Sequence, residues 1–130
     1  MALDSETEEY RKNLPRHQFY LIFTERCLEG TAAEEAHQQH LKAHYAWLAD
    51  LDRRGLLFAA GPLRDSSSGW DGSGLFIVRA ASREEAHALA QTEPMHAKGI
   101  RKFRIVPWQL NEGGFTIRVS HAAGRFTMSA

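Results

Sequence analysis

The sequence predicts an α+β fold of the ferredoxin-like type, with the element order β-α-β-β-α-β and one more strand after it. Two observations carry this prediction: two segments have helix-capping signals, and four short apolar or alternating segments surround them. In such an arrangement two helices cover one face of a four-stranded antiparallel sheet. The 130 residues suffice for one domain with its own core.

The composition is that of an ordinary globular protein, with 43% hydrophobic and 25% charged residues. Acidic and basic residues number 16 each and no basic run stands out, so we expect no nucleic-acid partner. The single cysteine, Cys27, excludes a disulfide within the chain and fits a reducing compartment. No apolar run is long enough for a membrane span or a signal peptide, so we expect a cytoplasmic protein without a membrane partner.

The first strand is expected over residues 17–25, after a polar N-terminal tail of residues 1–17. Its alternate residues are largely apolar on both sides, as in a strand buried on both faces. Two helices cannot cover both faces of the sheet. We therefore predict a homodimer in which the sheets of two copies pack face to face.

A long helix is expected from Thr31 to Gly55. Thr31 and Glu34 form a capping-box pattern at its start, and Gly55 can adopt the left-handed conformation that ends a helix. His37, His40 and His44 fall within about 60° of arc on the helix, on the side that also carries its leucines. We expect His37, near the helix start, to be exposed.

The remaining elements follow from turn residues and periodicity. Trp70 is the only large apolar residue in a polar, glycine-rich loop between two strands that form a hairpin. Pro107 predicts an edge or bulge position in the last strand of the domain. The expected elements are strands at 56–61, 75–79 and 101–110, a loop at 64–74, a helix at 82–93 with a turn at 94–99, and a C-terminal extension at 111–130 with one strand at 115–120 and a loose end.

Several short motifs occur in a fixed order between residues 18 and 110. His44 precedes Gly55 by eleven residues, the segment LLFAAGPL follows, the second helix ends at Glu93-Pro94, and the closing strand is KFRIVPW. In this ordered set the sequence resembles the YCII-related (YciI-like) family of dimeric α+β barrel proteins. The resemblance implies a ferredoxin-like protomer that dimerises through its sheet.

The resemblance also implies a site in which a helix histidine meets an acidic residue, here His44 and Glu93. The family usually has aspartate where this chain has glutamate. A histidine held by a carboxylate can act as a general base. We therefore expect a small-molecule acid/base enzyme, an isomerase or lyase that needs no cofactor, acting on a cyclic or aromatic molecule.

Four further residues are candidates for contact with a substrate or ligand: His40, Arg64, Trp70 and His96. Arg64 could hold an anionic group. Two alternatives remain open at this point. His40 and His44 are one helical turn apart and could bind a metal ion together with His37 or His96. The chain could also be a ligand-binding module without catalytic activity.

Overall fold

The fold is known from a computed structural model that describes residues 2–67 and 69–129. Met1 of the expected tail, Ser68 of the expected loop and Ala130 of the expected extension lie outside the described residues. The chain divides into two compact units, Gln18–Gln109 and a second unit formed by Met1–His17 with Leu110–Ala130.

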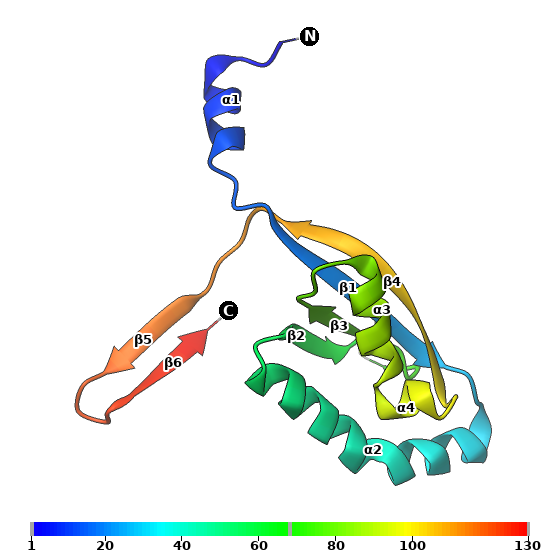
Figure 1. Ribbon diagram of the computed structural model, residues 1–130. Helices are drawn as coiled ribbons and strands as arrows, with labels where there is room; N and C mark the ends of the chain where they lie inside the picture. Colours follow the sequence, from blue (N-terminus) through cyan, green and yellow to red (C-terminus); the bar gives the residue numbers. More distant parts are fainter. Residues whose placement is uncertain (1, 68, 130) are drawn as a thin grey trace. The chain divides into compact units, whose positions relative to one another are not determined.

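The order of elements is the expected one, with short additions at both ends (Figure 1). The elements are α1 (Ser5–Lys12), β1 (His17–Arg26), α2 (Gly30–Arg53), β2 (Leu57–Pro62), β3 (Gly74–Val78), α3 (Arg83–Gln91), α4 (Pro94–Ala97), β4 (Arg101–Leu110), β5 (Thr116–Ser120) and β6 (Arg125–Ser129).

Four strands form one sheet in the order β2-β3-β1-β4. Strand β3 runs antiparallel to both of its neighbours. Its residue Phe76 lies opposite Ile22 of β1 and opposite Ala60 of β2. This is the ferredoxin-like arrangement, so the predicted fold class is confirmed. Strand β4 lies at the sheet edge, as Pro107 predicts.

The core lies between one face of the sheet and the helices α2 and α3. Alternate residues of the strands point to this face, among them Tyr20 and Ile22 of β1 and Phe76 and Val78 of β3. Helix α3 contributes Ala86 and Ala90, which are one turn apart and small enough to bring the helix close to the sheet. Helix α2 contributes Trp47 and Leu51, also one turn apart.

The start of α2 differs from the prediction. The helix begins at Gly30, and Glu29 at its N-cap makes no side-chain capping hydrogen bond, so the expected Thr31–Glu34 capping box is wrong. The Glu34 carboxylate instead accepts a hydrogen bond from Gln38 and lies 3.9 Å from the Arg26 guanidinium. The end of the helix is as expected, because Gly55 has a φ of 73°.

The other face of the sheet is apolar, and no helix in the described part of the Gln18–Gln109 unit covers it. Phe19 packs against Phe58 and Trp108 there, with ring centroids 4.6 and 6.0 Å apart. Arg104 lies over the Phe23 ring, and the Phe58 side chain remains 42% exposed. We call this surface the open face of the sheet.

The second unit holds one helix and one hairpin. Helix α1 has no buried residue, and Asp4 caps it by accepting a hydrogen bond from the Thr7 amide. The extension contains two strands, β5 and β6, where the sequence analysis expected one. The residues judged loose include Arg125–Ser129, which pairs antiparallel with Thr116–Ser120. The sequence analysis did not predict this strand because its alternation of polar and apolar residues is short and lies among small and polar residues.

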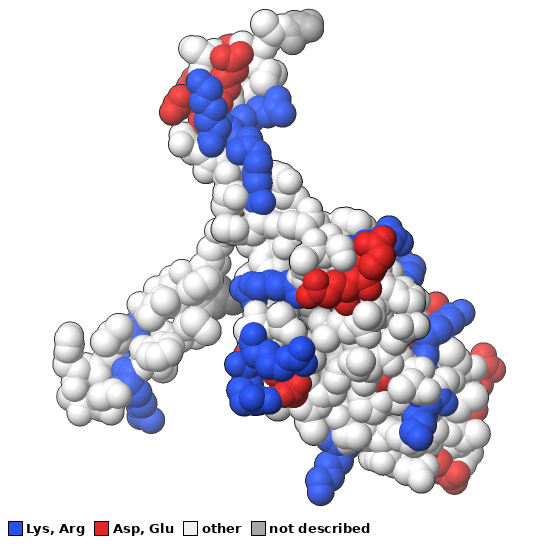
Figure 2. Space-filling model, viewed as in Figure 1, with Lys and Arg blue, Asp and Glu red and all other residues white. Residues whose placement is uncertain are grey.

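Basic and acidic side chains are interspersed over the Gln18–Gln109 unit on the face seen in Figure 2. The β5–β6 hairpin is largely uncharged on its visible surface. Among residues 2–67 and 69–129, no helix combines the length and apolar character needed to cross a membrane.

Candidate functional site

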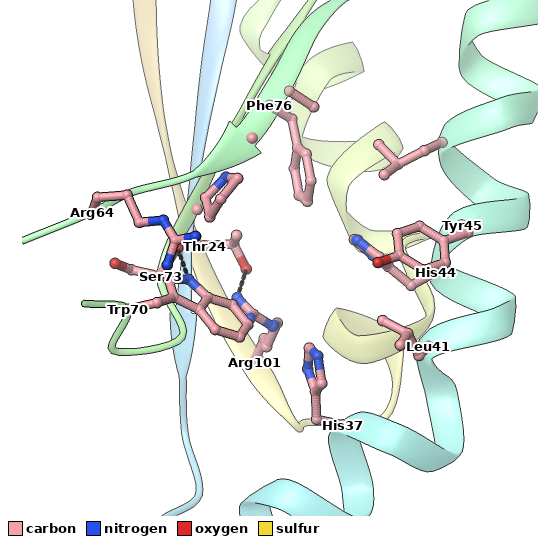
Figure 3. Close-up of a pocket in the computed structure, with 15 residues that line it drawn as sticks. Thr24, His37, Leu41, His44, Tyr45, Arg64, Trp70, Ser73, Phe76 and Arg101 are labelled. Atoms are coloured by element: carbon pink, nitrogen blue, oxygen red, sulfur yellow. Dashed lines mark hydrogen bonds between the residues drawn. The ribbon is translucent and has the colours of Figure 1, made fainter. Parts of the chain in front are cut away.

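A pocket of about 420 Å³ lies between helix α2 and the sheet (Figure 3). Helix α2 supplies one side, from which Leu41, His44 and Tyr45 project. The β2–β3 hairpin and its loop supply Arg64, Trp70 and Phe76. The remaining lining residues are Thr24, His37, Leu48, Ala60, Gly61, Pro62, Ser73, Gly74 and Arg101.

His44, which lines the pocket, is in direct contact with Glu93, which does not line it. The His44 Nδ1 atom lies 2.9 Å from the Glu93 Oε1 atom, although the residues are 49 positions apart in sequence. Helix α2 directs His44 toward the sheet, and Pro94 ends the preceding helical segment so that Glu93 turns back into the core. The Glu93 side chain is fully buried, and the His44 side chain is 16% exposed.

Glu93 uses its second carboxylate oxygen to begin helix α4. The backbone amides of Met95 and His96 each donate a hydrogen bond to Oε2 at 3.0 Å. Burial raises the pKa of Glu93, but the hydrogen bond to His44, the nearby His96 and these two amides together hold that pKa below its usual value. Glu93 is therefore a carboxylate at neutral pH.

A carboxylate at this position fixes the orientation and tautomer of the His44 ring. Because Glu93 accepts a hydrogen bond from Nδ1–H, Nε2 is the ring nitrogen left with a lone pair for a molecule in the pocket. The ring also packs beside Phe76 and Tyr45, with centroids 5.9 and 5.5 Å away. A ring oriented in this way can act as a proton acceptor toward a molecule in the pocket.

Two of the other candidate residues, Arg64 and Trp70, line the same pocket. The Trp70 indole N–H donates to the Ser73 carbonyl at 2.7 Å, which holds the ring in place within its loop. His37 also lines the pocket, and it is half-buried, not exposed as expected. Its ring meets the Trp70 ring edge-on with centroids 5.6 Å apart, which explains its partial burial.

The structure places His40 and His96 away from the pocket wall. The His40 Nδ1–H donates to the Ala36 carbonyl of its own helix at 2.9 Å. His96 is buried: its Nδ1–H donates to the Ala90 carbonyl at 2.7 Å, and its Nε2 lies 2.8 Å from the Thr24 hydroxyl. His96 therefore contacts the pocket residue Thr24 without lining the pocket itself. Burial lowers the pKa of His96, although the Ala90 carbonyl and Glu93 act in the opposite direction.

The described part of the chain holds no group of three histidine, cysteine, aspartate or glutamate residues placed to bind a metal ion. His40 and His44 direct their Nδ1 atoms to different partners, Ala36 and Glu93. The spacing of one helical turn therefore does not create a shared ligand position here.

Sequence reasoning missed Arg101, which lines the pocket and is only 7% exposed. Its Nη1 atom donates to the Thr24 hydroxyl oxygen, 3.4 Å away and 77 positions earlier in the chain. A signal was present in the strand pattern, because Arg101 alternates in phase with Phe103 and Ile105, which face the helices. A charged residue in phase with core residues indicates a charge turned inward.

Comparison with known proteins gives the same fold for the central unit. Residues 18–109 match the YCII-related domain. The uncharacterized protein YjpA of Bacillus subtilis (strain 168) is 29% identical over 93 residues, which are 72% of this chain and 96% of YjpA.

A solved structure is similar to 69% of this chain and to 92% of its own length, with a TM-score of 0.56 and 19% identity. It is the 5-chloro-2-hydroxyhydroquinone dehydrochlorinase TftG from Burkholderia phenoliruptrix AC1100, in complex with 2,5-dihydroxybenzoquinone. At this identity the similarity establishes the fold alone. Because the family match covers residues 18–109 of 130, the chain belongs to the YCII-related family.

Proposed function

We propose that this protein is a small-molecule enzyme that uses His44 and Glu93 to move a proton during an isomerisation or elimination. The observation that carries the proposal is the 2.9 Å contact between His44 Nδ1 and Glu93 Oε1, with His44 lining a pocket of about 420 Å³. Pockets of this size hold small metabolites. Proton transfer by such a pair requires no cofactor.

His44 acts as the general base in this mechanism. Its Nε2 accepts a proton from the substrate, and Glu93 stabilises the imidazolium that forms. The Met95 and His96 amides keep Glu93 ionised and in position during this step. In an isomerisation the proton returns to another substrate atom. In an elimination it passes to solvent while the bonding electrons of the departing group leave with that group.

The name of TftG supports the elimination branch. A dehydrochlorinase removes HCl, and removal of a proton is half of that reaction. The shared fold makes a cyclic substrate with acidic hydroxyl groups a reasonable first choice for this chain. Arg64 and Trp70 are the proposed substrate contacts among the four candidates. Neither His40 nor His96 lines the pocket, so we assign them structural roles. His40 bonds to the Ala36 carbonyl of its own helix, and His96 contacts the Thr24 hydroxyl.

We also propose that the protein acts as a homodimer formed through the open face of the sheet. Phe58 and the half-buried Leu21, Phe23 and Trp108 leave apolar surface there without a covering element in the Gln18–Gln109 unit. A second copy would bury this surface.

The proposed reaction is tested with 5-chloro-2-hydroxyhydroquinone, with chloride release measured in solution, and with unchlorinated 2-hydroxyhydroquinone in D₂O, with deuterium uptake followed by NMR. We expect His44→Gln to lower the rate by about 10²- to 10⁴-fold, the usual contribution of a general base. His40→Gln is the matched control, because it changes a histidine one turn away that does not line the pocket, and it should stay near the wild-type rate.

Equal rates for the wild type and His44→Gln would contradict the role of His44. Binding of either compound without turnover by the wild type would favour a ligand-binding module over an enzyme.

A further inference from the structure

Arg101 is a buried cation without an acidic partner. The residue is 7% exposed, and its only hydrogen bond within the described residues is the long contact with the Thr24 hydroxyl. None of the ion pairs among the described residues includes it. A guanidinium has five N–H donors, and a buried charge without an anion destabilises a fold. Its position therefore needs an explanation beyond packing.

The carboxylates that act on Arg101 from a distance are occupied elsewhere. Glu93 divides its oxygens between His44 and the amides at the start of α4. Asp71 accepts hydrogen bonds from the amide and the hydroxyl of Ser73. The positive charge of Arg26 also acts on Arg101, and burial lowers the Arg101 pKa. Glu93 and Asp71 oppose this lowering from a distance, but neither carboxylate forms an ion pair with the guanidinium among the described residues.

We propose that Arg101 is an anion-binding residue, and that the pocket selects a planar, single-ring aromatic molecule carrying a carboxylate or an ionised hydroxyl group. The proposal deepens the proposed function by naming the substrate class of the same pocket, and it rests on that function only for the reaction at His44. Arg64 lines the same pocket and adds a second positive charge.

The preference for an aromatic ring follows from the side chains that surround Arg101 and Arg64 in the pocket. The Cζ atoms of Arg101 and Arg26 lie 5.9 and 5.4 Å from the centroid of the Trp70 ring. Leu41, Leu48 and Phe76 make much of the remaining wall apolar. A flat ring can pack against these side chains while its anionic substituent reaches Arg101.

The two ends of the pocket differ in chemistry. Figure 3 shows Arg64, Trp70 and Arg101 on the sheet side and His44 with Tyr45 on the side of α2. A bound ring would therefore direct its anionic group toward the arginines and another edge toward His44. Arg101 would stabilise negative charge that develops on the ring when His44 removes a proton.

Benzoate and benzamide test the proposal, because they have nearly the same shape and differ in charge at pH 7. We expect the wild type to bind benzoate at least about tenfold more tightly than benzamide, as measured by isothermal titration calorimetry, since charge-assisted hydrogen bonds are the stronger ones. Equal affinity for the two compounds in the wild type would overturn the proposal without any variant.

Arg101→Met removes the charge and keeps much of the side-chain volume. We expect it to weaken benzoate binding about tenfold or more and to leave benzamide binding within about twofold. The unliganded variant should be as stable as the wild type or more stable, because an unpaired buried cation is removed. Arg101→Lys should bind benzoate with intermediate affinity, and it serves as the informative variant if Arg101→Met does not fold.

Arg54→Gln is the matched control, because it removes a positive charge that pairs with Asp50 at the end of α2 and does not line the pocket. It should bind benzoate like the wild type, and a loss equal to that of Arg101→Met would overturn the proposal. His44→Gln should keep its preference for benzoate over benzamide. If the wild type prefers benzoate to benzamide but turns over neither compound of the reaction test, the proposed reaction fails while the anion site stands.

Discussion

Glu93 joins two features that would otherwise be independent. One carboxylate oxygen holds His44 and the other begins α4, so the residue that fixes the site also fixes the local backbone. The methylene by which glutamate exceeds aspartate does not prevent the contact, which is 2.9 Å long. A substitution at Glu93 would therefore change stability and site geometry together. His44 is the cleaner position at which to test chemistry.

The titration of the buried groups predicts how stability depends on pH. Burial lowers the pKa of His96 and of His37 from 6.5, so below that value the unfolded chain binds protons more readily than the folded one. The Glu93 pKa is also held below its usual 4.5, which acts in the same direction at lower pH. The free energy of unfolding should therefore be fully developed above about pH 6.5, decrease as the pH falls below it, and decrease further below about 4.5.

Urea denaturation between pH 8 and pH 4 measures this dependence. The variant His96→Gln, which can still donate to the Ala90 carbonyl, should show a smaller loss between pH 6.5 and pH 5. A wild-type stability that stays constant or increases on acidification through this interval would contradict the lowered pKa values of His96 and His37.

At the scale of single residues, sequence reasoning reached the side chains on α2 and missed those that other elements bring to them. The position of His44 on the inner face follows from helical periodicity alone. Its pairing with Glu93 was implied only by family resemblance, since no local pattern links residues 49 positions apart. Arg101 and Thr24 meet because β1 and β4 are neighbours in the sheet, which depends on tertiary structure.

At the scale of elements, the periodic segments were predicted well, and Ser82 caps the second helix by accepting a hydrogen bond from the Glu85 amide. The capping box of α2 and strand β6 were not predicted correctly. The core strands and α2 follow from apolar patterns long enough to outweigh local exceptions. The capping box of α2 failed because Glu34 has other partners, Gln38 and Arg26. Strand β6 has only five residues, and the small and polar residues around it obscure its short polar–apolar alternation.

Helix α2 should owe its stability to the face that packs on the sheet. Leu51 is fully buried there, so Leu51→Ala should lower the free energy of unfolding by about 3 to 4 kcal/mol, through lost burial and the cavity left behind. Leu3→Ala makes the same change at a side chain that is 43% exposed, and it should alter stability by less than about 0.5 kcal/mol. Chemical denaturation of both variants measures the difference. Similar losses for the two would mean that α2 does not depend on this contact.

At the scale of the whole molecule, the open face of the sheet is the feature that a single chain leaves unexplained. Both sides of β1 are apolar, and the helices of the Gln18–Gln109 unit cover only one of them. Leu21 and Ile77 lie opposite each other on the open face, and Phe23 and Leu75 form the next pair along the strands. Such paired apolar positions are typical of a sheet that packs on another sheet.

If the protein is the proposed homodimer, a charge placed on the open face should separate it into folded monomers. Leu21→Glu places a carboxylate where a second sheet would bury it, and burying an unpaired carboxylate is strongly unfavourable. In a monomer the same carboxylate would meet water, so the variant should keep its fold.

We expect light scattering after size exclusion to give twice the chain mass for the wild type and one chain mass for Leu21→Glu. Ala49→Glu, at an exposed position on α2, adds the same charge and should leave the dimer intact. A wild type that elutes as a monomer, or a Leu21→Glu variant that remains a dimer, would show that the open face is not the interface.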